Sequence, residues 1–238
     1  MRNTGTIALK EIKSYLTSPM AYVVTGIFLV LTGTFFTTYL AATQYTDTSI
    51  RGFVESGNIL LLLFAAILTM RLIAEERKLG TWELLLTAPV RDTEVILGKF
   101  LGSLAILMGM LVLTLYYPIV LIILGDPDMG PIGTSYLGLF LLGCASLAVG
   151  IFASSLTSNQ IVAAVVAGGI LFALWFVSMA ANFVPEALGE VLSYLSLSYH
   201  FNDFIRGLVD TRAIIYYLSV TALFLYLAIR SLETSRWG

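Results

Sequence analysis

The chain has 238 residues, of which 58% are hydrophobic and only 12% are charged, and its mean hydropathy is +0.90. A soluble domain carries about 25% charged residues and roughly 45–50% apolar ones, so a soluble chain of this composition could not cover its own surface. The composition therefore predicts a polytopic membrane protein and excludes a secreted, disulfide-stapled domain. A net charge of −2 leaves no basic surface for nucleic acid, and the single cysteine, Cys144, cannot form an intramolecular disulfide.

Uncharged stretches of the chain mark the membrane spans. A helix needs about 20 mainly apolar residues to cross about 30 Å of hydrocarbon. The uncharged stretch 129–185 is too long for one helix, and the polar cluster at 157–160 divides it. Pro118 is expected to kink the third span. The sequence thus predicts six transmembrane helices, at approximately residues 20–42, 57–74, 100–124, 133–154, 160–181 and 213–231.

Lysine and arginine residues predict the orientation, because they accumulate in cytoplasmic loops. Of the 13 in the chain, ten lie before the first span, between Arg71 at the end of the second span and the start of the third, or from Arg230 at the end of the last span onward. The exceptions are Arg51, Arg206 and Arg212. Both termini are therefore predicted to be cytoplasmic, which agrees with an even number of spans. The length of the first span, and the lack of a clear cleavage site after it, argue against a cleavable signal peptide.

Residues 1–19 are predicted to form an amphipathic helix that Pro19 ends or bends before the first span. At 100° per residue, one arc is apolar and the opposite arc carries Lys10 and Lys13. A basic polar face of this kind suits the cytoplasmic membrane surface, where the helix could serve merely as an anchor. The apolar arc consists of Ala8, Leu9, Ile12, Tyr15 and Leu16.

The segment 75–99, between the second and third spans, is charged at both ends and apolar in the middle. Gly80 can end one helix in a left-handed conformation, Thr81 can cap the next, and Pro89 stops it. Asp92 can then cap the long helix that becomes the third span. The apolar middle contains Trp82, Leu84, Leu85 and Leu86. Because these side chains would cost free energy in water, the short helix is either an interfacial helix against lipid or a docking element for a cytosolic protein.

Residues 182–212, between the fifth and sixth spans, are too apolar for a solvated loop. Pro185 suits a first helical position, and apolar residues then recur at helical spacing. A pair of short helices dipping into the outer leaflet would satisfy both the polarity and the backbone hydrogen bonding. The alternative is a helix lying on the outer membrane surface. The apolar positions are Leu188, Val191, Leu192 and Leu195.

Several kinds of chemistry are missing from the sequence. No P-loop motif is present, and one histidine with one cysteine makes no metal site of recognisable spacing. Ser198 and His200 are too close in sequence to form a catalytic dyad, so His200 is expected to cap or to hydrogen-bond. Carboxylates are absent from the centres of all six spans, which argues against a proton- or sodium-coupled transporter.

Small residues spaced four apart allow two helices to approach closely. One such pair is Gly98 and Gly102, and a second row is Ser146, Gly150 and Ser154. These rows fit intramolecular packing and a homodimer seam equally well.

Residues 76–90 read Glu-Arg-Lys-Leu-Gly-Thr-Trp-Glu-Leu-Leu-Leu-Thr-Ala-Pro-Val, and residues 94–99 read Glu-Val-Ile-Leu-Gly-Lys. This resembles the cytoplasmic loop of ABC-2 type transporter permeases, E-x-x-x-G-T-x-E-x-L-L-x-[S/T]-x-P with a later E-x-x-x-[G/S]-K. The chain departs from that form before Pro89, where many members have Ser or Thr directly before the proline. Residues 195–207, with Asp210, Tyr216 and Tyr217, also resemble the outer segment that enters the family's sixth span. Within the family, the chain looks most like gliding-motility-type and multidrug-type permease subunits.

The resemblance implies an all-α, type V exporter-like ABC-2 fold in which residues 1–238 form a single transmembrane domain. Two permease subunits, identical or not, would pair, and each would dock on a separate ATPase that binds ATP and Mg, with no cofactor or catalytic residue on this chain. The protein would lie in a prokaryotic plasma (inner) membrane, in contact with lipid, and export an amphiphile such as a lipid, a glycan or a drug by alternating access. Aromatic-rich, uncharged spans also favour amphiphiles over ions.

The resemblance also implies roles for individual residues. Glu76 and Glu83 would pair with a basic rim on the ATPase, and the leucines and tryptophan would fill a groove on it. The coupling helix would comprise Glu76, Gly80, Thr81, Trp82, Glu83, Leu84, Leu85, Leu86 and Pro89. The N-terminal helix would be the connecting helix, with Ile12, Tyr15 and Leu16. An outer re-entrant segment would include Pro185, His200, Phe201 and Gly207.

Three other functions remain open at the level of sequence. An ion-coupled secondary transporter or channel would need no ATPase and would be driven by ion gradients alone. A polytopic membrane enzyme would depend on His200 or Ser198. A membrane assembly scaffold would share the docking helix but transport nothing.

Overall fold

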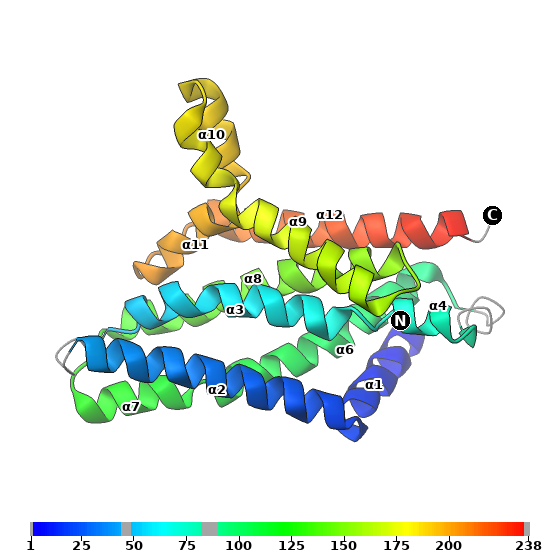
Figure 1. The fold of residues 1–238 in the computed structure, drawn as a ribbon, viewed down its shortest axis with the longest axis horizontal. Helices are drawn as coiled ribbons and strands as arrows, with labels where there is room; N and C mark the ends of the chain where they lie inside the picture. The colour runs from blue at the N-terminus through cyan, green and yellow to red at the C-terminus, as the bar shows by residue number, and fades with distance from the viewer. Residues whose placement is uncertain (1, 44–48, 82–89, 236–238) are drawn as a thin grey trace.

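A computed structural model describes residues 2–43, 49–81 and 90–235, and every regular element within these ranges is helical (Figure 1). The order is α1 (Arg2–Thr17), α2 (Pro19–Ala42), α3 (Arg51–Thr69), α4 (Ala74–Lys78), α6 (Asp92–Leu113), α7 (Tyr116–Leu124), α8 (Met129–Ser155), α9 (Gln160–Ala180), η1 (Ala181–Phe183), α10 (Glu186–Tyr194), α11 (Leu197–Ile205) and α12 (Thr211–Ser235).

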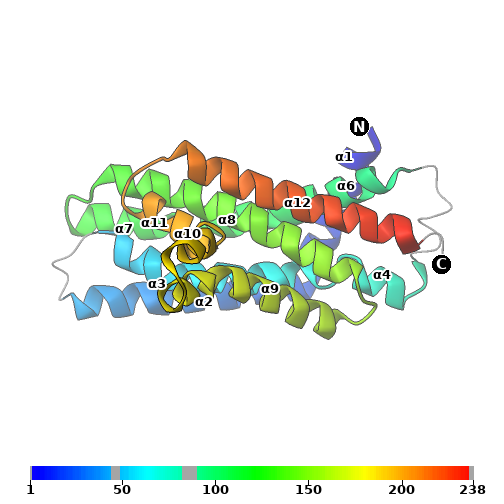
Figure 2. The same ribbon diagram turned by 90° about the horizontal axis from the view of Figure 1, so that it is seen from above.

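Within the described ranges, six helical stretches are long and apolar enough to cross a membrane, which agrees with the predicted number. They are Pro19–Ala42, Gly57–Lys78, Asp92–Leu124, Met129–Ser155, Gln160–Ala180 and Thr211–Thr234. The third stretch includes the helical turns from Asp92 that precede the predicted span 100–124, and these polar turns pack against α1. Both chain ends lie at the same end of the bundle as α4, as an even number of spans requires (Figures 1 and 2).

The third span is broken where the sequence predicts a kink. α6 ends at Leu113 and α7 begins at Tyr116. Pro118 has no N–H to donate and its ring collides with the carbonyl four residues earlier, that of Thr114. This carbonyl accepts instead from the Tyr117 N–H at 3.0 Å and from the Tyr136 hydroxyl at 2.8 Å, so the break leaves no orphaned acceptor.

Helix α8 lies at the centre of the bundle, between α12 and α3 (Figure 2), and it also packs against α6, α9 and α11. Small residues make this central position possible. Ser146, Gly150 and Ser154 are all buried, and a Cβ atom added to Gly150 would collide with Thr69 of α3. This row therefore serves packing within the chain rather than a dimer seam.

Two short helices, α10 and α11, occupy the segment between α9 and α12. The first turn of α10 begins at Glu186, so Pro185 is its N-cap residue and not, as the sequence predicts, its first helical residue. α10 stands off from the bundle (Figure 1) and packs chiefly on α9, η1 and α11, while α11 packs on α8. The apolar side chains of α10 remain exposed, among them Leu188, Val191 and Tyr194.

Candidate functional site

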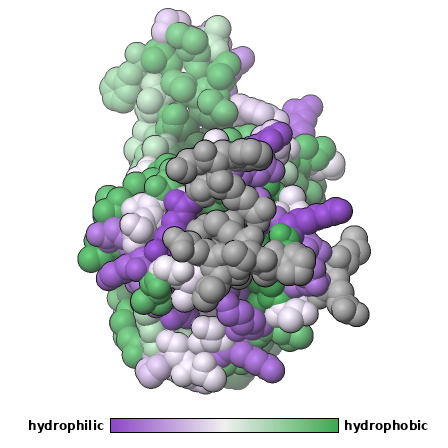
Figure 3. Space-filling view, turned by 90° about the vertical axis from the view of Figure 1, so that its right-hand side faces the viewer, coloured by the Kyte–Doolittle hydropathy of each residue, from purple (hydrophilic) through white to green (hydrophobic). Residues whose placement is uncertain are grey.

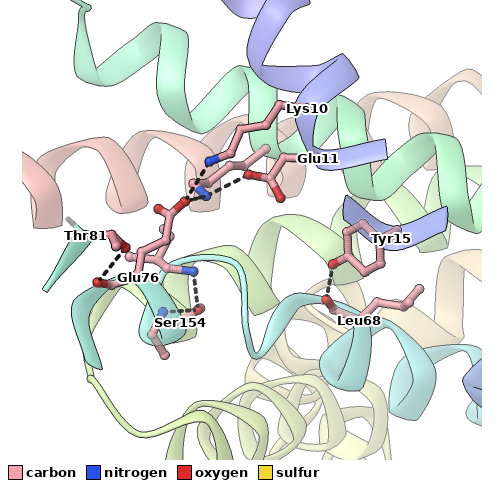
Figure 4. Close-up of polar contacts among 10 residues, drawn as sticks. Lys10, Glu11, Tyr15, Leu68, Glu76, Thr81 and Ser154 are labelled. Atoms are coloured by element: carbon pink, nitrogen blue, oxygen red, sulfur yellow. Dashed lines mark hydrogen bonds and ion pairs between the residues drawn. The ribbon is translucent and has the colours of Figure 1, made fainter. Parts of the chain in front are cut away.

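A cluster of four charged residues joins α1, α4 and α6 at the end of the bundle where the chain termini lie (Figure 4). The Nζ atom of Lys99 lies 2.8 Å from Oε1 of Glu76 and 3.0 Å from Oε1 of Glu11. Lys10 Nζ approaches the same Glu76 oxygen at 3.4 Å. We call Lys10, Glu11, Glu76 and Lys99 the ion cluster.

The ion cluster is largely buried, so its charged groups need partners of opposite charge. Lys99 is 1% exposed and Glu11 is 8% exposed, whereas the side chain of Lys10 is 61% exposed. A buried ammonium is tolerated only when it is paired, and two carboxylates surround this one. With Lys10 included, two positive charges balance two negative ones. The second oxygen of Glu76, Oε2, is buried and has no hydrogen-bond partner among the described residues.

Two glycines on α6 bring α1 close enough to place Glu11 over Lys99. A Cβ atom at Gly98 would lie 2.7 Å from Cβ of Ile7, and one at Gly102 would lie 2.6 Å from Cβ of Glu11. No larger residue fits at either position without moving α1. This glycine pair therefore also serves contact within the chain.

The start of α6 is capped differently from the prediction. Arg91, not Asp92, is the N-cap residue, and its N–H donates to Oε2 of Glu94 at 3.2 Å. The same oxygen accepts from Nδ2 of Asn3 at 3.1 Å. Glu94 sits at the third helical position, from which a glutamate reaches back to the N-cap N–H. The contact to Asn3 ties the first turn of α1 to the first turn of α6.

Tyr15 anchors the other end of α1. It is 2% exposed, and its hydroxyl donates to the carbonyl of Leu68 on α3. The Arg71 guanidinium lies 4.1 Å from the centre of the Tyr15 ring. Burial raises the pKa of the Tyr15 phenol to about 12, and the nearby Arg71 charge opposes that rise. Tyr15 therefore fixes α1 to the end of the second span from which α4 follows.

The buried face of α1 differs from the predicted apolar arc. Ala8, Glu11 and Tyr15 are buried, whereas Leu9 is 60% and Leu16 is 53% exposed. Tyr15, one of the three predicted connecting-helix residues, is thus buried against α3. Ile12 and Leu16 instead line an apolar groove between α1, α2 and α6 that has a volume of about 610 Å³.

Helix α4 holds the start of the predicted docking segment. The hydroxyl of Ser154 accepts from the N–H groups of Ile73 and Ala74, both at 3.1 Å, so the start of α4 is fixed to α8. Gly80 follows the helix with φ +70°, the left-handed conformation that the sequence predicts. The Thr81 hydroxyl donates to the carbonyl of Glu76 at 3.3 Å and so caps α4.

The remaining predicted docking residues lie outside the described ranges. They are Trp82, Glu83, Leu84, Leu85, Leu86 and Pro89. Hydrophilic side chains gather on the face of the molecule at this end (Figure 3). Glu76 is engaged by Lys99 and Lys10 of its own chain, so its predicted pairing with an ATPase remains a prediction that would have to use Oε2.

The four outer residues singled out from the sequence are dispersed. His200 is 3% exposed, its Nε2 lies 2.9 Å from the Tyr194 carbonyl oxygen, and its ring stacks on Tyr216 with centroids 4.1 Å apart. Phe201 is buried, Pro185 is exposed, and Gly207 has φ +89° beside Pro131.

A catalytic dyad at this place is ruled out by the hydrogen bonds. The Ser198 hydroxyl donates to the Trp175 carbonyl at 2.9 Å, while His200 bonds to Tyr194. The prediction of a hydrogen-bonding histidine is therefore confirmed. Within the described parts of the chain, no group of three or more His, Cys, Asp or Glu side chains could hold a metal ion.

Sequence reasoning missed the pairing of Glu11 with Lys99. Lys99 belongs to the quoted family motif, but Glu11 lies beside the apolar arc rather than on it. The sequence did contain a sign that Glu11 would be paired, because Glu11 is the only acidic residue of α1 and lies in one helical row with Ala8 and Tyr15. Acidic residues within a buried helical row need a cationic partner.

The sequence profile of the family described as ABC-2 family transporter protein matches residues 5–235, nearly the whole chain. The chain belongs to the ABC-2 transporter family. This ABC-2 protein is thus a multi-pass membrane protein with the all-helical fold that its sequence predicts. The family supplies non-catalytic membrane subunits, in agreement with the expectation that the chain is not itself an enzyme.

Two relatives of this ABC-2 protein carry the name "Probable multidrug ABC transporter permease YbhS", one from Escherichia coli (strain K12) and one from Escherichia coli O157:H7. Each is 38% identical to it over 116 residues. The match covers 46% of this chain and 28% of the length of either relative.

Proposed function

We propose that this ABC-2 protein is the permease subunit of an ATP-driven exporter of amphiphiles. A separate ATPase, which binds ATP and Mg, docks on the segment that follows α4, and two permease subunits, identical or not, pair in the lipid bilayer. The protein lies in a prokaryotic plasma membrane with both termini in the cytoplasm. The observation that carries this proposal is the buried contact of Lys99 with both Glu76 and Glu11.

The ion cluster supports a mechanical role because of where its members lie. Glu76 is on α4, directly before the predicted docking helix, and Lys99 is on α6, the start of the third span. Separating the two would leave a buried ammonium short of one counter-charge, which is costly. A force applied to α4 by an ATPase would therefore move α6 with it.

The N-terminal helix would move as part of the same body. Glu11 binds Lys99 on one side of α1, and Tyr15 fixes the end of α1 to α3. Motion of α4 would thus reach the second and third spans together, as alternating access requires. The named relatives, multidrug permeases by their printed description, favour an amphiphilic substrate over an ion.

The experiment is co-expression with a candidate ATPase, purification of the complex, and measurement of ATP hydrolysis and transport in proteoliposomes. Leu85→Asp should uncouple hydrolysis from transport or abolish the complex, because a carboxylate would be buried in an apolar groove. Leu156→Asp is the matched control, since Leu156 is 52% exposed at the C-terminal end of α8 and lies outside the docking segment.

If Leu85→Asp leaves complex and coupling intact, the docking assignment is wrong. Flux driven by an ion gradient without any ATPase would instead support a secondary transporter or channel. A stable complex with no transport at all would point to a scaffold.

A further inference from the structure

A polar cleft lies between α3, α9 and α11, far from the ion cluster. Its volume is about 310 Å³. The start of α3 and helix α11 lie toward the left in Figure 1, whereas α4 lies at the right-hand end. The cleft therefore opens in the half of the bundle away from the termini. Its polar lining consists of Glu55, Asn58, Ser178, Ser198 and Asn202.

Asn58 is the first observation that points to a ligand. It is 4% exposed as a residue, and its amide is not among the fully buried polar atoms that lack a hydrogen-bond partner. An amide can both donate and accept hydrogen bonds. This one lines a cleft large enough for a small polar group, so a ligand in the cleft can hydrogen-bond to it.

Glu55 is the second observation. It lies one helical turn before Asn58 on α3 and lines the same cleft, and it has no ion-pair partner among the described residues. Among the described residues, no lysine, arginine or histidine lines the cleft. The carboxylate therefore makes the cleft attractive to a cation.

The other polar groups of the cleft are two serine hydroxyls and the Asn202 amide. The Ser198 hydroxyl donates its hydrogen to the Trp175 carbonyl at 2.9 Å, and its oxygen lies 2.9 Å from the Ser196 hydroxyl and 3.3 Å from the Ser178 hydroxyl. A hydroxyl oxygen can accept two hydrogen bonds, so the serines can contribute acceptors to a ligand. A carboxylate, an amide oxygen and hydroxyl oxygens together suit a group with several N–H donors. A protonated primary amine, with one charge and three donors, meets that description.

The rest of the cleft wall is apolar and partly aromatic. Trp175 and Phe201 are buried in it, while Phe176 is 41% and Met179 is 61% exposed on the outer side of α9. Aromatic faces attract cations, and the exposed apolar side chains continue toward the surrounding bilayer. The ligand is therefore expected to have an apolar tail attached to its amine.

We propose that this cleft binds the protonated primary amine of an amphiphile, with Glu55 as counter-charge and Asn58 as a hydrogen-bond partner. That such an amine is the exported substrate rests on the proposed exporter function. That the cleft binds the amine is independent of that function. The site distinguishes a primary ammonium, which donates three hydrogen bonds, from a quaternary ammonium, which donates none.

The binding test uses the full chain in nanodiscs of phosphatidylcholine, which contains no primary amine. Dodecylamine, dodecyltrimethylammonium and dodecanol are titrated calorimetrically, and the partitioning into empty nanodiscs is subtracted. Dodecylamine should bind saturably and about tenfold or more tightly than the other two, since hydrogen bonds to a charged group are among the stronger ones. Equal binding of all three, or no saturable binding, would overturn the proposal.

Three variants assign the binding to the cleft. Glu55→Gln should weaken dodecylamine binding by about tenfold or more, whereas Glu55→Asp should retain most of it. Glu186→Gln, at an exposed carboxylate on α10 outside the cleft, is the matched control and should change nothing. Unchanged binding by Glu55→Gln would refute the assignment.

Asn58→Leu provides a readout that a merely structural role would not produce. Because the amide lines the cleft, replacing it by an apolar group of similar size should leave the unfolding temperature nearly unchanged, while dodecylamine binding is lost. A variant that unfolds earlier and still binds would contradict the role of Asn58.

Transport assays separate this proposal from the exporter proposal. If dodecylamine binds through Glu55 but the complex with an ATPase does not move it, the cleft stands and its role as a substrate site is wrong. If the complex exports dodecylamine and Glu55→Gln leaves the KM unchanged, the exporter stands and the cleft assignment is wrong.

Discussion

The ammonium of Lys99 lies 2.8 Å from Oε1 of Glu76, across the interface between the start of the third span and the short helix that leads into the predicted docking segment. With Glu11 as its second partner, this lysine is the point at which the three helices α1, α4 and α6 are joined. The consequences of that arrangement can be measured.

Loss of one partner from the ion cluster should lower the free energy of unfolding substantially. Lys99→Met leaves Glu11 buried without a cationic partner, beside a Glu76 that keeps only the exposed Lys10, and we expect a loss of stability of about 3–5 kcal/mol. Thermal unfolding in detergent or nanodiscs measures it. The double variant Lys99→Met with Glu11→Gln should recover part of the loss, because the orphaned charge is removed. Lys10→Met is the control, since Lys10 is largely exposed, and its effect should stay within about 0.5 kcal/mol. Additive losses in the double variant would argue against the pairing.

Because α1 packs closely on α6, alanine substitutions at two glycines of α6 should change the stability of the protein differently. Gly102→Ala would place a Cβ atom 2.6 Å from Cβ of Glu11, so it should destabilise by about 1–3 kcal/mol and displace α1. Gly109→Ala meets nothing within 4 Å and should be neutral or stabilise by up to about 1 kcal/mol. Limited proteolysis of α1, together with the unfolding temperature, separates these outcomes. Equal behaviour of the two variants would mean that α1 does not pack where the structure has it.

Tyr15 should give the protein a pH dependence in the alkaline range. Burial raises its pKa from 10.0 to about 12, so the folded state favours the neutral phenol. The resulting stability is fully present below pH 10 and is lost as the pH rises toward 12, because the unfolded chain ionises first. Unfolding temperatures between pH 8 and 12 should therefore fall more steeply for the natural protein than for Tyr15→Phe. Parallel profiles would show that Tyr15 does not titrate from a buried site.

The predicted orientation can be tested with introduced cysteines, because the only natural one, Cys144, is buried. Lys13→Cys lies in the predicted cytoplasmic helix and Asp126→Cys lies in the loop after α7. In intact cells a membrane-impermeant maleimide should label Asp126→Cys and leave Lys13→Cys unlabelled until the membrane is opened. The reverse pattern would invert the topology and with it the docking proposal.

The sequence by itself determined the features that arise from local physics. Six spans follow from the length of apolar segments against the thickness of a bilayer, the break near Pro118 from the missing N–H, and the left-handed turn at Gly80 from the missing Cβ. Each depends on a short stretch of chain. The family resemblance, carried by a contiguous motif, could be seen at the same level and was confirmed.

Only the tertiary structure decided which residues meet. Glu11 and Lys99 are 88 positions apart, and Tyr15 and Leu68 are 53 apart. The helical row that contains Ala8, Glu11 and Tyr15 could be read from α1, but not the neighbour that it faces. Helix packing chooses that neighbour through shape, here two glycines that admit α1 against α6. The cleft that Glu55 and Asn58 line could not be predicted for the same reason, because it is formed by three assembled helices and not by any one of them.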